Sequence, residues 1–173
     1  MLDILLKRRT SRKFDSTKEV EKEKIEEIVR AGLVAPSGKN QQLAEIFVIT
    51  NKEFRDRLAE LNAKVWGVGT AVDPFYGAPV ILLVASKPSP FADLDGAAII
   101  QNMLLEATNQ GLGTCWIHRA KEELQLEETK ALFASRGLDI SDYVGVDHIA
   151  LGYSLAPTPA EKVIRPGRVH YID

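Results

Sequence analysis

The stretch PVILLVA, residues 79–85, is a continuous apolar run. Such a run is typical of a strand that is buried on both faces in the middle of a sheet. A short turn with two prolines separates it from DLDGAAIIQNMLLEATN, residues 93–109. Apolar residues cover most of the circumference of the helix that this second stretch predicts, so we expect a buried core helix. We expect this strand and this helix to form the centre of the fold.

Strand formers also dominate three other stretches, and amphipathic patterns indicate helices between them. The further strands are predicted at residues 44–50, 114–118 and 146–153. The further helices are predicted at residues 2–6, 21–35 and 121–136, and after Asn51, where Phe54, Leu58 and Leu61 share one face. Because helices separate the strands and no repeat or linker divides the chain, residues 1–173 are expected to form one domain, a mixed α/β (α+β) sandwich.

Composition narrows the class of protein. The chain is 45% hydrophobic and 27% charged, which is typical of a globular protein, and its net charge of −2 argues against a nucleic-acid surface. A single cysteine, Cys115, excludes a disulfide within the chain and fits a reducing compartment. No apolar run reaches the ~20 residues of a membrane span, and the N-terminal charges are in the wrong order for a signal peptide. We therefore expect a cytoplasmic protein.

Several catalytic motifs are missing from the sequence. It has no G-x-G-x-x-G after a strand, no Walker loop and no G-x-S-x-G. His118, His148 and His170 are too widely spaced for a helical zinc motif, so no metal site is predicted. Cys115 lies in an apolar strand and is more simply a small buried hydrophobe than a nucleophile. This pattern favours a protein in which a bound cofactor supplies the chemistry.

Two polar segments are candidates for binding such a cofactor. Residues 7–13 of KRRTSRKF combine five cations with two hydroxyls and can grip a phosphate; the alternative is a solvated basic turn. In APSGKNQQ, residues 35–42, Asn40 and Gln42 lie two apart, so they project from the same face of an extended segment. Their amides can match a pyrimidine or flavin ring; the alternative is a polar turn that leads into a strand.

Two other segments are left open. Residues 67–77 are irregular, with Trp66, Phe75 and Tyr76 in or beside them, and these aromatic groups either form a lid over a flat ligand or pack internally. The tail, residues 157–173, has basic residues and prolines, then a strand-like piece at 169–172. It has little core of its own, so we expect it to add to a neighbouring element or to a partner subunit.

Four motifs in this order, across almost the whole chain, resemble the flavin (FMN)-dependent nitroreductase family. The first is R-x-S-x-[RK]-x-F, matched by residues 8–14 with Thr10 in place of the usual serine. The second is P-S-x-x-N-x-Q, matched by residues 36–42. G-L-G-[ST]-C-W-[IL] is matched by residues 111–117, and L-G-Y-[PS] by residues 151–154.

The resemblance implies roles for individual residues. The FMN phosphate and ribityl chain would be held by Arg8, Arg9, Thr10 and Arg12, with Arg165 as an added phosphate ligand and Lys162 and Arg168 as alternatives. Pro36, Ser37 and Gly38 would approach the flavin from the partner subunit. Asn40 and Gln42 would lie near the flavin ring and the ribityl chain. The backbone near the reactive edge of the ring would be that of Cys115, Trp116 and Ile117. No catalytic side chain is implied, because flavin N5 carries the chemistry.

The resemblance also implies a fold and a reaction. The fold is a nitroreductase-like three-layer sandwich with a central, mostly antiparallel sheet, and a homodimer that holds FMN at its interface and exchanges the tail, residues 157–173. The reaction is ping-pong hydride transfer from NAD(P)H to a nitroaromatic, quinone or similar flat acceptor. The alternatives are a flavin-binding or storage protein, a specialised flavin enzyme of the dehalogenase or azoline oxidase type, and an α/β protein without flavin.

Overall fold

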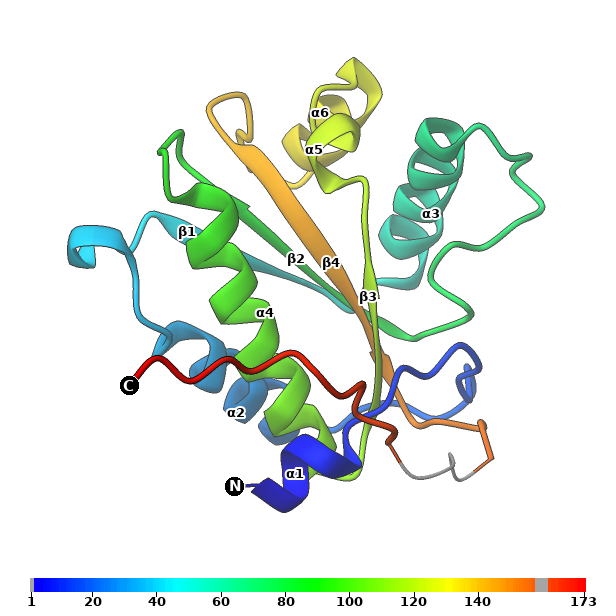
Figure 1. The fold of residues 1–173 in the computed structure, drawn as a ribbon. Coiled ribbons are helices and arrows are strands. Elements are labelled where there is room, and N and C mark those ends of the chain that lie inside the picture. Colours follow the sequence, from blue (N-terminus) through cyan, green and yellow to red (C-terminus); the bar gives the residue numbers. More distant parts are fainter. Residues whose placement is uncertain (1, 158–161) are drawn as a thin grey trace.

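The computed structural model describes residues 2–157 and 162–173, and in these residues the strands form one antiparallel sheet (Figure 1). The strands are β1 (Ala44–Ile49), β2 (Val80–Ser86), β3 (Gly113–Ile117) and β4 (Val144–Gly152). Their order in the sheet is β1-β2-β4-β3, and each neighbouring pair is antiparallel. All four lie where the sequence predicts a strand.

The helices agree with the sequence except in one place. They are α1 (Leu2–Lys7), α2 (Lys22–Leu33), the 3₁₀ turn η1 (Gly38–Asn40), α3 (Lys52–Trp66), α4 (Ala92–Asn109), α5 (Ala120–Glu123) and α6 (Glu127–Ala134). The prediction of a single helix at 121–136 is wrong. Leu124 and Phe133 are nine positions apart, so on one straight helix they would face opposite sides. An extended residue, Leu126, breaks the helix, and both side chains are buried in the same core.

The central strand divides the apolar interior into two cores. On β2, Ile81 and Leu83 pack into the core that includes residues of α3, α5 and α6. The alternate residues, Leu82 and Val84, pack into the second core, against α2 and α4. Every residue of β2 is buried, as expected for a strand covered on both faces. The result is a mixed α+β sandwich of three layers, with α2 and α4 in front of the sheet in Figure 1.

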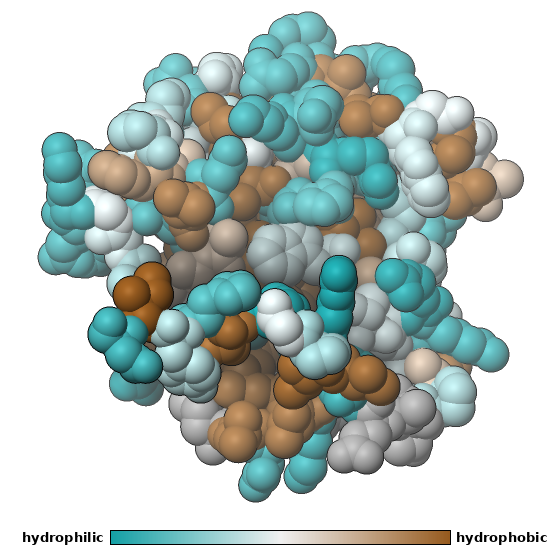
Figure 2. Space-filling view, in the orientation of Figure 1, coloured by the Kyte–Doolittle hydropathy of each residue, from teal (hydrophilic) through white to brown (hydrophobic). Residues whose placement is uncertain are grey.

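The core helix α4 is buried on one side only. Its inner face, with Ile100 and Met103, is fully buried, whereas Leu94 on its outer side is 71% exposed and Leu105 is half-buried. Further exposed apolar residues lie on α1, and Figure 2 shows apolar groups over the lower part of this front face. The expectation of a buried helix therefore holds for its inner face.

The loop at 67–77 is held by its own Asp73 and by Arg55 of α3. Both carboxylate oxygens of Asp73 accept backbone N–H groups, from Phe75 at 2.9 Å and Gly77 at 2.7 Å. The buried Arg55 donates to Asp73 and to the Ala78 carbonyl. Phe75 is fully buried, 5.3 Å from the His148 ring, so for this residue the packing alternative is correct.

The tail has no strand among its described residues, 162–173, and its side chains there are exposed. It passes in front of α4 in Figure 1. Residues 158–161 of the predicted tail lie outside the described part of the chain. Of the helices that are described, none has the length and apolar character needed to cross a bilayer.

Candidate functional site

Three of the four sequence motifs meet at one end of the sheet. We call residues 7–13 the basic turn. Its Thr10 pairs with Thr114 of β3, and the Ser11 N–H donates to the Thr114 carbonyl at 2.8 Å. The Ser11 hydroxyl lies 2.7 Å from that of Ser154, which follows β4. The Leu155 N–H donates to the Lys13 carbonyl at 2.9 Å. These contacts hold the basic turn against β3 and the end of β4.

Close packing at this junction explains a glycine of the third motif. A Cβ atom on Gly113 would lie 2.8 Å from the Ser154 Cβ and 3.1 Å from the Ser11 Cβ. A larger residue would separate the basic turn from the strand. Gly152 is similarly tight, since its Cβ would lie 2.7 Å from Cδ of Pro79.

A hollow of about 320 Å³ opens beside this junction. Its walls come from the basic turn, from the glycine-rich entry to β3 and from the chain after β4, and they include Arg9, Thr10, Gly113 and Tyr153. The basic turn, the entry to β3 and the chain after β4 therefore surround a space that Lys7 and Arg9 help to line.

Three cations of the basic turn have no carboxylate partner in the described part of the chain. Within residues 2–157 and 162–173, Arg8, Arg12 and Lys13 make no ion pair. Partial burial, together with the neighbouring charge of Arg9, lowers the pKa of the Arg8 guanidinium. A bound anion would relieve this cost, because an opposite charge favours the ionised form.

The middle of β3 separates its side chains between the two cores. Cys115 is buried, and burial raises the pKa of its thiol, although the nearby Arg12 opposes this effect. Cys115 is therefore a small core residue, as the sequence predicts. Trp116 points to the other face, where its indole N–H donates to Asp147 Oδ2 at 2.6 Å.

His118, directly after β3, joins this group. Its Nδ1 lies 2.8 Å from the same oxygen of Asp147. Burial raises the pKa of the Asp147 carboxyl, and the hydrogen bonds from Trp116 and His118 oppose the rise. The sequence motifs assign Asp147 no role, and for His118 they raise only the question of a metal ligand. The available signal was a lone acidic residue in the apolar strand 146–153.

Residues 35–42, which we call the carboxamide turn, are not extended. The prediction that an extended backbone places Asn40 and Gln42 on one face is therefore wrong. Residues 38–40 form η1, and Lys39, Asn40 and Gln42 have positive φ angles of 54°, 54° and 51°. The two amides meet nevertheless, because Gln42 Nε2 donates to Asn40 Oδ1 at 2.9 Å. Left-handed backbone costs of order 1–3 kcal/mol per residue and is concentrated at functional sites. Both side chains are exposed.

This turn lies at the other end of α4 from the basic turn. The Gly38 N–H donates to Asp95 Oδ1 at 2.9 Å, and a Cβ on Gly38 would overlap the Phe91 ring. These contacts fix the turn, with Pro36 and Ser37, beside the N-terminus of α4. The basic turn pairs with β3, which follows the C-terminus of α4. At 18 residues, α4 is about 27 Å long, so one chain does not bring the two segments together.

No polar contact ties the predicted tail ligands to this junction among the residues that the structure describes. Lys162, Arg165 and Arg168 are exposed, and in the described part of the chain they form no hydrogen bond or ion pair. Of the predicted ligands, the chain therefore assembles only those of the basic turn and of β3.

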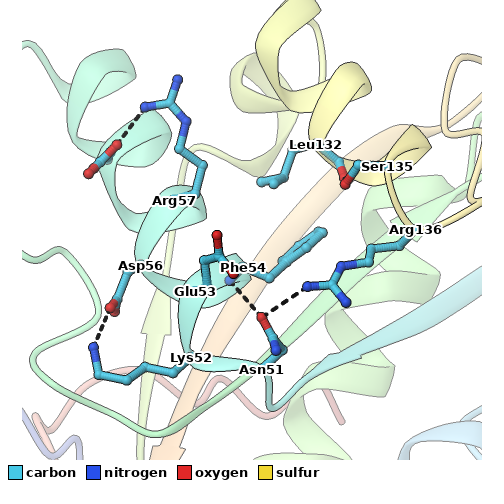
Figure 3. Close-up of a pocket in the computed structure, with 10 residues that line it drawn as sticks. Asn51, Lys52, Glu53, Phe54, Asp56, Arg57, Leu132, Ser135 and Arg136 are labelled. Carbon is cyan, nitrogen blue, oxygen red and sulfur yellow. Dashed lines mark hydrogen bonds and ion pairs between the residues drawn. The ribbon is translucent and has the colours of Figure 1, made fainter.

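A larger hollow, of about 770 Å³, lies between α3 and α6 and contains none of the predicted ligands (Figure 3). Asn51 at its base caps α3 by accepting the Phe54 N–H at 2.9 Å, and it also accepts from Arg136 at 3.3 Å. The Lys52–Asp56 and Arg57–Glu60 ion pairs link its charged groups within α3.

Comparison with known proteins places the chain in a family. Residues 5–153 match the Nitroreductase family. The chain belongs to this family. The match includes the basic turn, the carboxamide turn, β3 and the end of β4, so it covers the first three motifs and residues 151–153 of the fourth.

Nitroreductases of known structure share the whole fold. One from Bacteroides fragilis, solved with bound FMN, is 25% identical, with a TM-score of 0.87 over 99% of this chain and 98% of that one. The FMN-dependent nitroreductase of Clostridium difficile R20291 is 26% identical, with a TM-score of 0.81 over 100% and 99% of the two chains. A relative from Methanothermobacter thermautotrophicus, provisionally named an NADH dehydrogenase/NAD(P)H nitroreductase, is 27% identical over 98% of this chain and 85% of its own length.

This nitroreductase-family chain also has a buried polar cluster behind β3 and β4. Glu123 and His148 are fully buried, with Glu123 Oε2 3.4 Å from His148 Nε2. Asn62 donates to the same carboxylate oxygen at 2.6 Å, and Arg119 donates to Asn62 at 3.0 Å. Burial raises the pKa of Glu123 to about 8 and lowers that of His148 to about 3. Both groups are therefore largely uncharged at neutral pH, with the proton on Glu123.

Proposed function

We propose that this protein is an FMN-dependent oxidoreductase that transfers a hydride from NAD(P)H to a nitroaromatic, quinone or similar flat acceptor. The observation that carries the proposal is that Arg8 and Arg12, in the turn that pairs with β3, make no ion pair in the described part of the chain. Family membership supports it, as do the FMN in the Bacteroides fragilis structure and the name of the Methanothermobacter relative.

The residues of the junction fit an FMN phosphate and ribityl chain. Lys7, Arg9 and Thr10 line the hollow of about 320 Å³ and supply an ammonium, a guanidinium and a hydroxyl as donors. Arg8 and Arg12, in the same turn, add further positive charge. From there β3 leads to Trp116 and on to a second hollow, of about 440 Å³, beside His118. The phosphate would bind at the start of β3 and the ring along its far half, against the backbone of residues 115–117.

A complete site requires a second copy of the chain. The carboxamide turn is separated from the basic turn by the length of α4, so Pro36, Ser37, Gly38, Asn40 and Gln42 would come from the partner. The exposed outer side of α4 and the apolar residues of α1 offer the surface that a homodimer would bury. FMN would then lie at the interface.

The tail has a matching docking site on the partner. In the described sheet, β1 is an edge strand with apolar hollows on both faces, of about 370 and 610 Å³. On an extended tail, Val169 and Tyr171 would face one hollow, and Ile172 the other. Exchange of the tail in this way would also carry Arg165 and Arg168 across the interface, where either can add to the phosphate site.

The chemistry would belong to the cofactor: bound FMN accepts a hydride from NAD(P)H and delivers it to the second substrate. The chain would orient the ring and stabilise charge. Backbone N–H groups and amides near the pyrimidine edge favour the negative charge that the flavin gains on reduction. The exchange of one substrate for the other on the same ring face would make the kinetics ping-pong.

The first test is the visible spectrum of the protein reconstituted with FMN and treated anaerobically with NADH and, separately, NADPH. Flavin peaks that bleach and return with p-benzoquinone or a nitroaromatic compound would support the proposal. Bound flavin that stays oxidised would support a binding or storage role instead. A protein that does not bind FMN would refute both.

A pair of variants tests the phosphate site. Arg12→Ala is expected to weaken FMN binding by about 1–3 kcal/mol, the scale of a lost charge-assisted hydrogen bond. Lys13→Ala removes a cation from the same turn at a position that is not a predicted ligand, so its effect should be much smaller. Equal losses in the two variants, measured by fluorescence titration of FMN, would mean that only the general charge of the turn matters.

A further inference from the structure

Trp116, Asp147 and His118 form a hydrogen-bonded group at the far end of β3. One carboxylate oxygen, Oδ2 of Asp147, accepts the Trp116 indole N–H at 2.6 Å and lies 2.8 Å from His118 Nδ1. The Asp147 side chain is only 11% exposed, whereas that of His118 is 79% exposed. A nearly buried carboxylate therefore holds an imidazole that is exposed to solvent.

The hydrogen bond determines which ring nitrogen of His118 faces outward. An ionised carboxylate only accepts hydrogen bonds, so the hydrogen between the two groups lies on Nδ1. The second nitrogen, Nε2, makes no hydrogen bond in the described part of the chain. A carboxylate that orients an imidazole through Nδ1 leaves Nε2 free to exchange a proton with a bound substrate.

The space beside His118 can hold a flat molecule. The hollow of about 440 Å³ is lined by Trp116 and His118, by Ala97 of α4 and by charged groups. Its volume is in the range of small-molecule sites, ~300–1,000 Å³. The charged groups that line it are Asp93, Arg119, Lys121, Glu122 and Asp147. Arg119 among these donates to Asn62, and Lys121 lies 3.7 Å from Asp93, whereas the His118 imidazole is oriented by Asp147.

We propose that His118 is the proton donor to the electron acceptor, and that Asp147 is the residue that positions it. This inference rests on the proposed function. A quinone that gains a hydride from the reduced flavin needs one proton to become a neutral hydroquinone. The Nε2–H bond of the His118 imidazolium breaks, an O–H bond forms on the acceptor, and the imidazole is left neutral. Asp147 stabilises the imidazolium, and solvent returns the proton to the exposed ring.

The comparison of two acceptors separates proton transfer from electron transfer. Ferricyanide takes electrons without a proton, whereas p-benzoquinone needs protons as well. In the FMN-loaded protein, His118→Gln is expected to slow reoxidation by p-benzoquinone about 100-fold, the usual contribution of a general acid. The reduction of the flavin by NADH and its reoxidation by ferricyanide should change less than threefold. Imidazole added to His118→Gly should restore part of the quinone rate.

The role of Asp147 has a readout that does not need turnover. Long-range ¹H–¹⁵N NMR of the ¹⁵N-histidine-labelled protein, without FMN, should show neutral His118 with its hydrogen on Nδ1. In Asp147→Ala the oxygen that accepts the Nδ1–H is removed, so the preference for the Nδ1–H form should be lost. Trp116→Phe is the matched control, because it removes the other hydrogen bond to the same oxygen and should leave the Nδ1–H form in place.

The outcomes distinguish this inference from the proposed function. If FMN binds and is reduced but His118→Gln reacts normally with p-benzoquinone, the inference is wrong and the proposed function stands. Equal slowing with ferricyanide would also overturn it, because the histidine would then affect electron transfer or access. Failure of wild-type protein to bind FMN or to accept electrons from NAD(P)H would instead refute the proposed function.

Discussion

Replacing Glu123 by glutamine is expected to remove the loss of stability that the wild-type protein shows as the pH rises from 6.5 to 8. The fully buried carboxyl has a pKa of about 8 in the folded protein, against 4.5 when exposed. Between these values the folded state holds a proton that the unfolded state has lost, so this group makes stability fall as pH rises. His148 has the opposite effect, since its pKa is about 3 when folded and 6.5 when exposed.

Together the two groups define three ranges of pH. From about 3 to 4.5 stability rises with pH, because the unfolded state alone binds the histidine proton. From 4.5 to 6.5 each state holds one proton, so the two effects cancel. From 6.5 to 8 only the folded state retains its proton, on Glu123, and stability falls by about 1.4 kcal/mol per pH unit, or roughly 2 kcal/mol in total.

Glu123→Gln copies the protonated carboxyl, since the amide is uncharged and its oxygen can accept from Asn62. The variant should therefore lose the fall between pH 6.5 and 8, and its stability should decline below pH 6.5, where wild-type stability is flat. Urea denaturation at fixed protein and FMN concentrations measures both slopes. Glu122→Gln, on the exposed side of the same helix, is the control and should follow wild type. Parallel curves for wild type and Glu123→Gln would refute the assignment of the proton to Glu123.

Two further predictions concern packing and assembly. Gly145→Ala should destabilise the protein by about 1–3 kcal/mol in urea denaturation, because its Cβ would lie 2.2 Å from the Ala120 carbonyl oxygen. Gly69→Ala is the control. Its Cβ meets nothing within 4 Å, so stability should change by less than about 0.5 kcal/mol. Deletion of residues 163–173 should shift the mass measured by light scattering from dimer toward monomer and weaken FMN binding. An unchanged dimer with unchanged FMN affinity would refute tail exchange.

Local sequence patterns predicted the helices and strands well where the spacing of apolar residues matches the faces that are buried. The apolar run at β2 and the pattern of α4 identified the centre of the fold, because a strand covered on both faces has no polar alternation. The helix at 121–136 failed for a reason visible in the same pattern: Leu124 and Phe133 cannot share one face of a straight helix. The backbone of the carboxamide turn was not predictable, since Lys39 and Gln42 adopt left-handed conformations that their residue types rarely take.

Sequence by itself determined the family of this protein, the described strands, most of the helices and the residues that match the family's motifs. These features depend on short-range order along the chain. Only the tertiary structure decided which of them meet. It brings Thr10 to Thr114 but leaves Asn40 at the opposite end of α4. It also pairs His118 with Asp147 and Glu123 with His148, across strands and helices far apart in the chain. Such contacts depend on sheet register and on packing between layers, which no local pattern encodes.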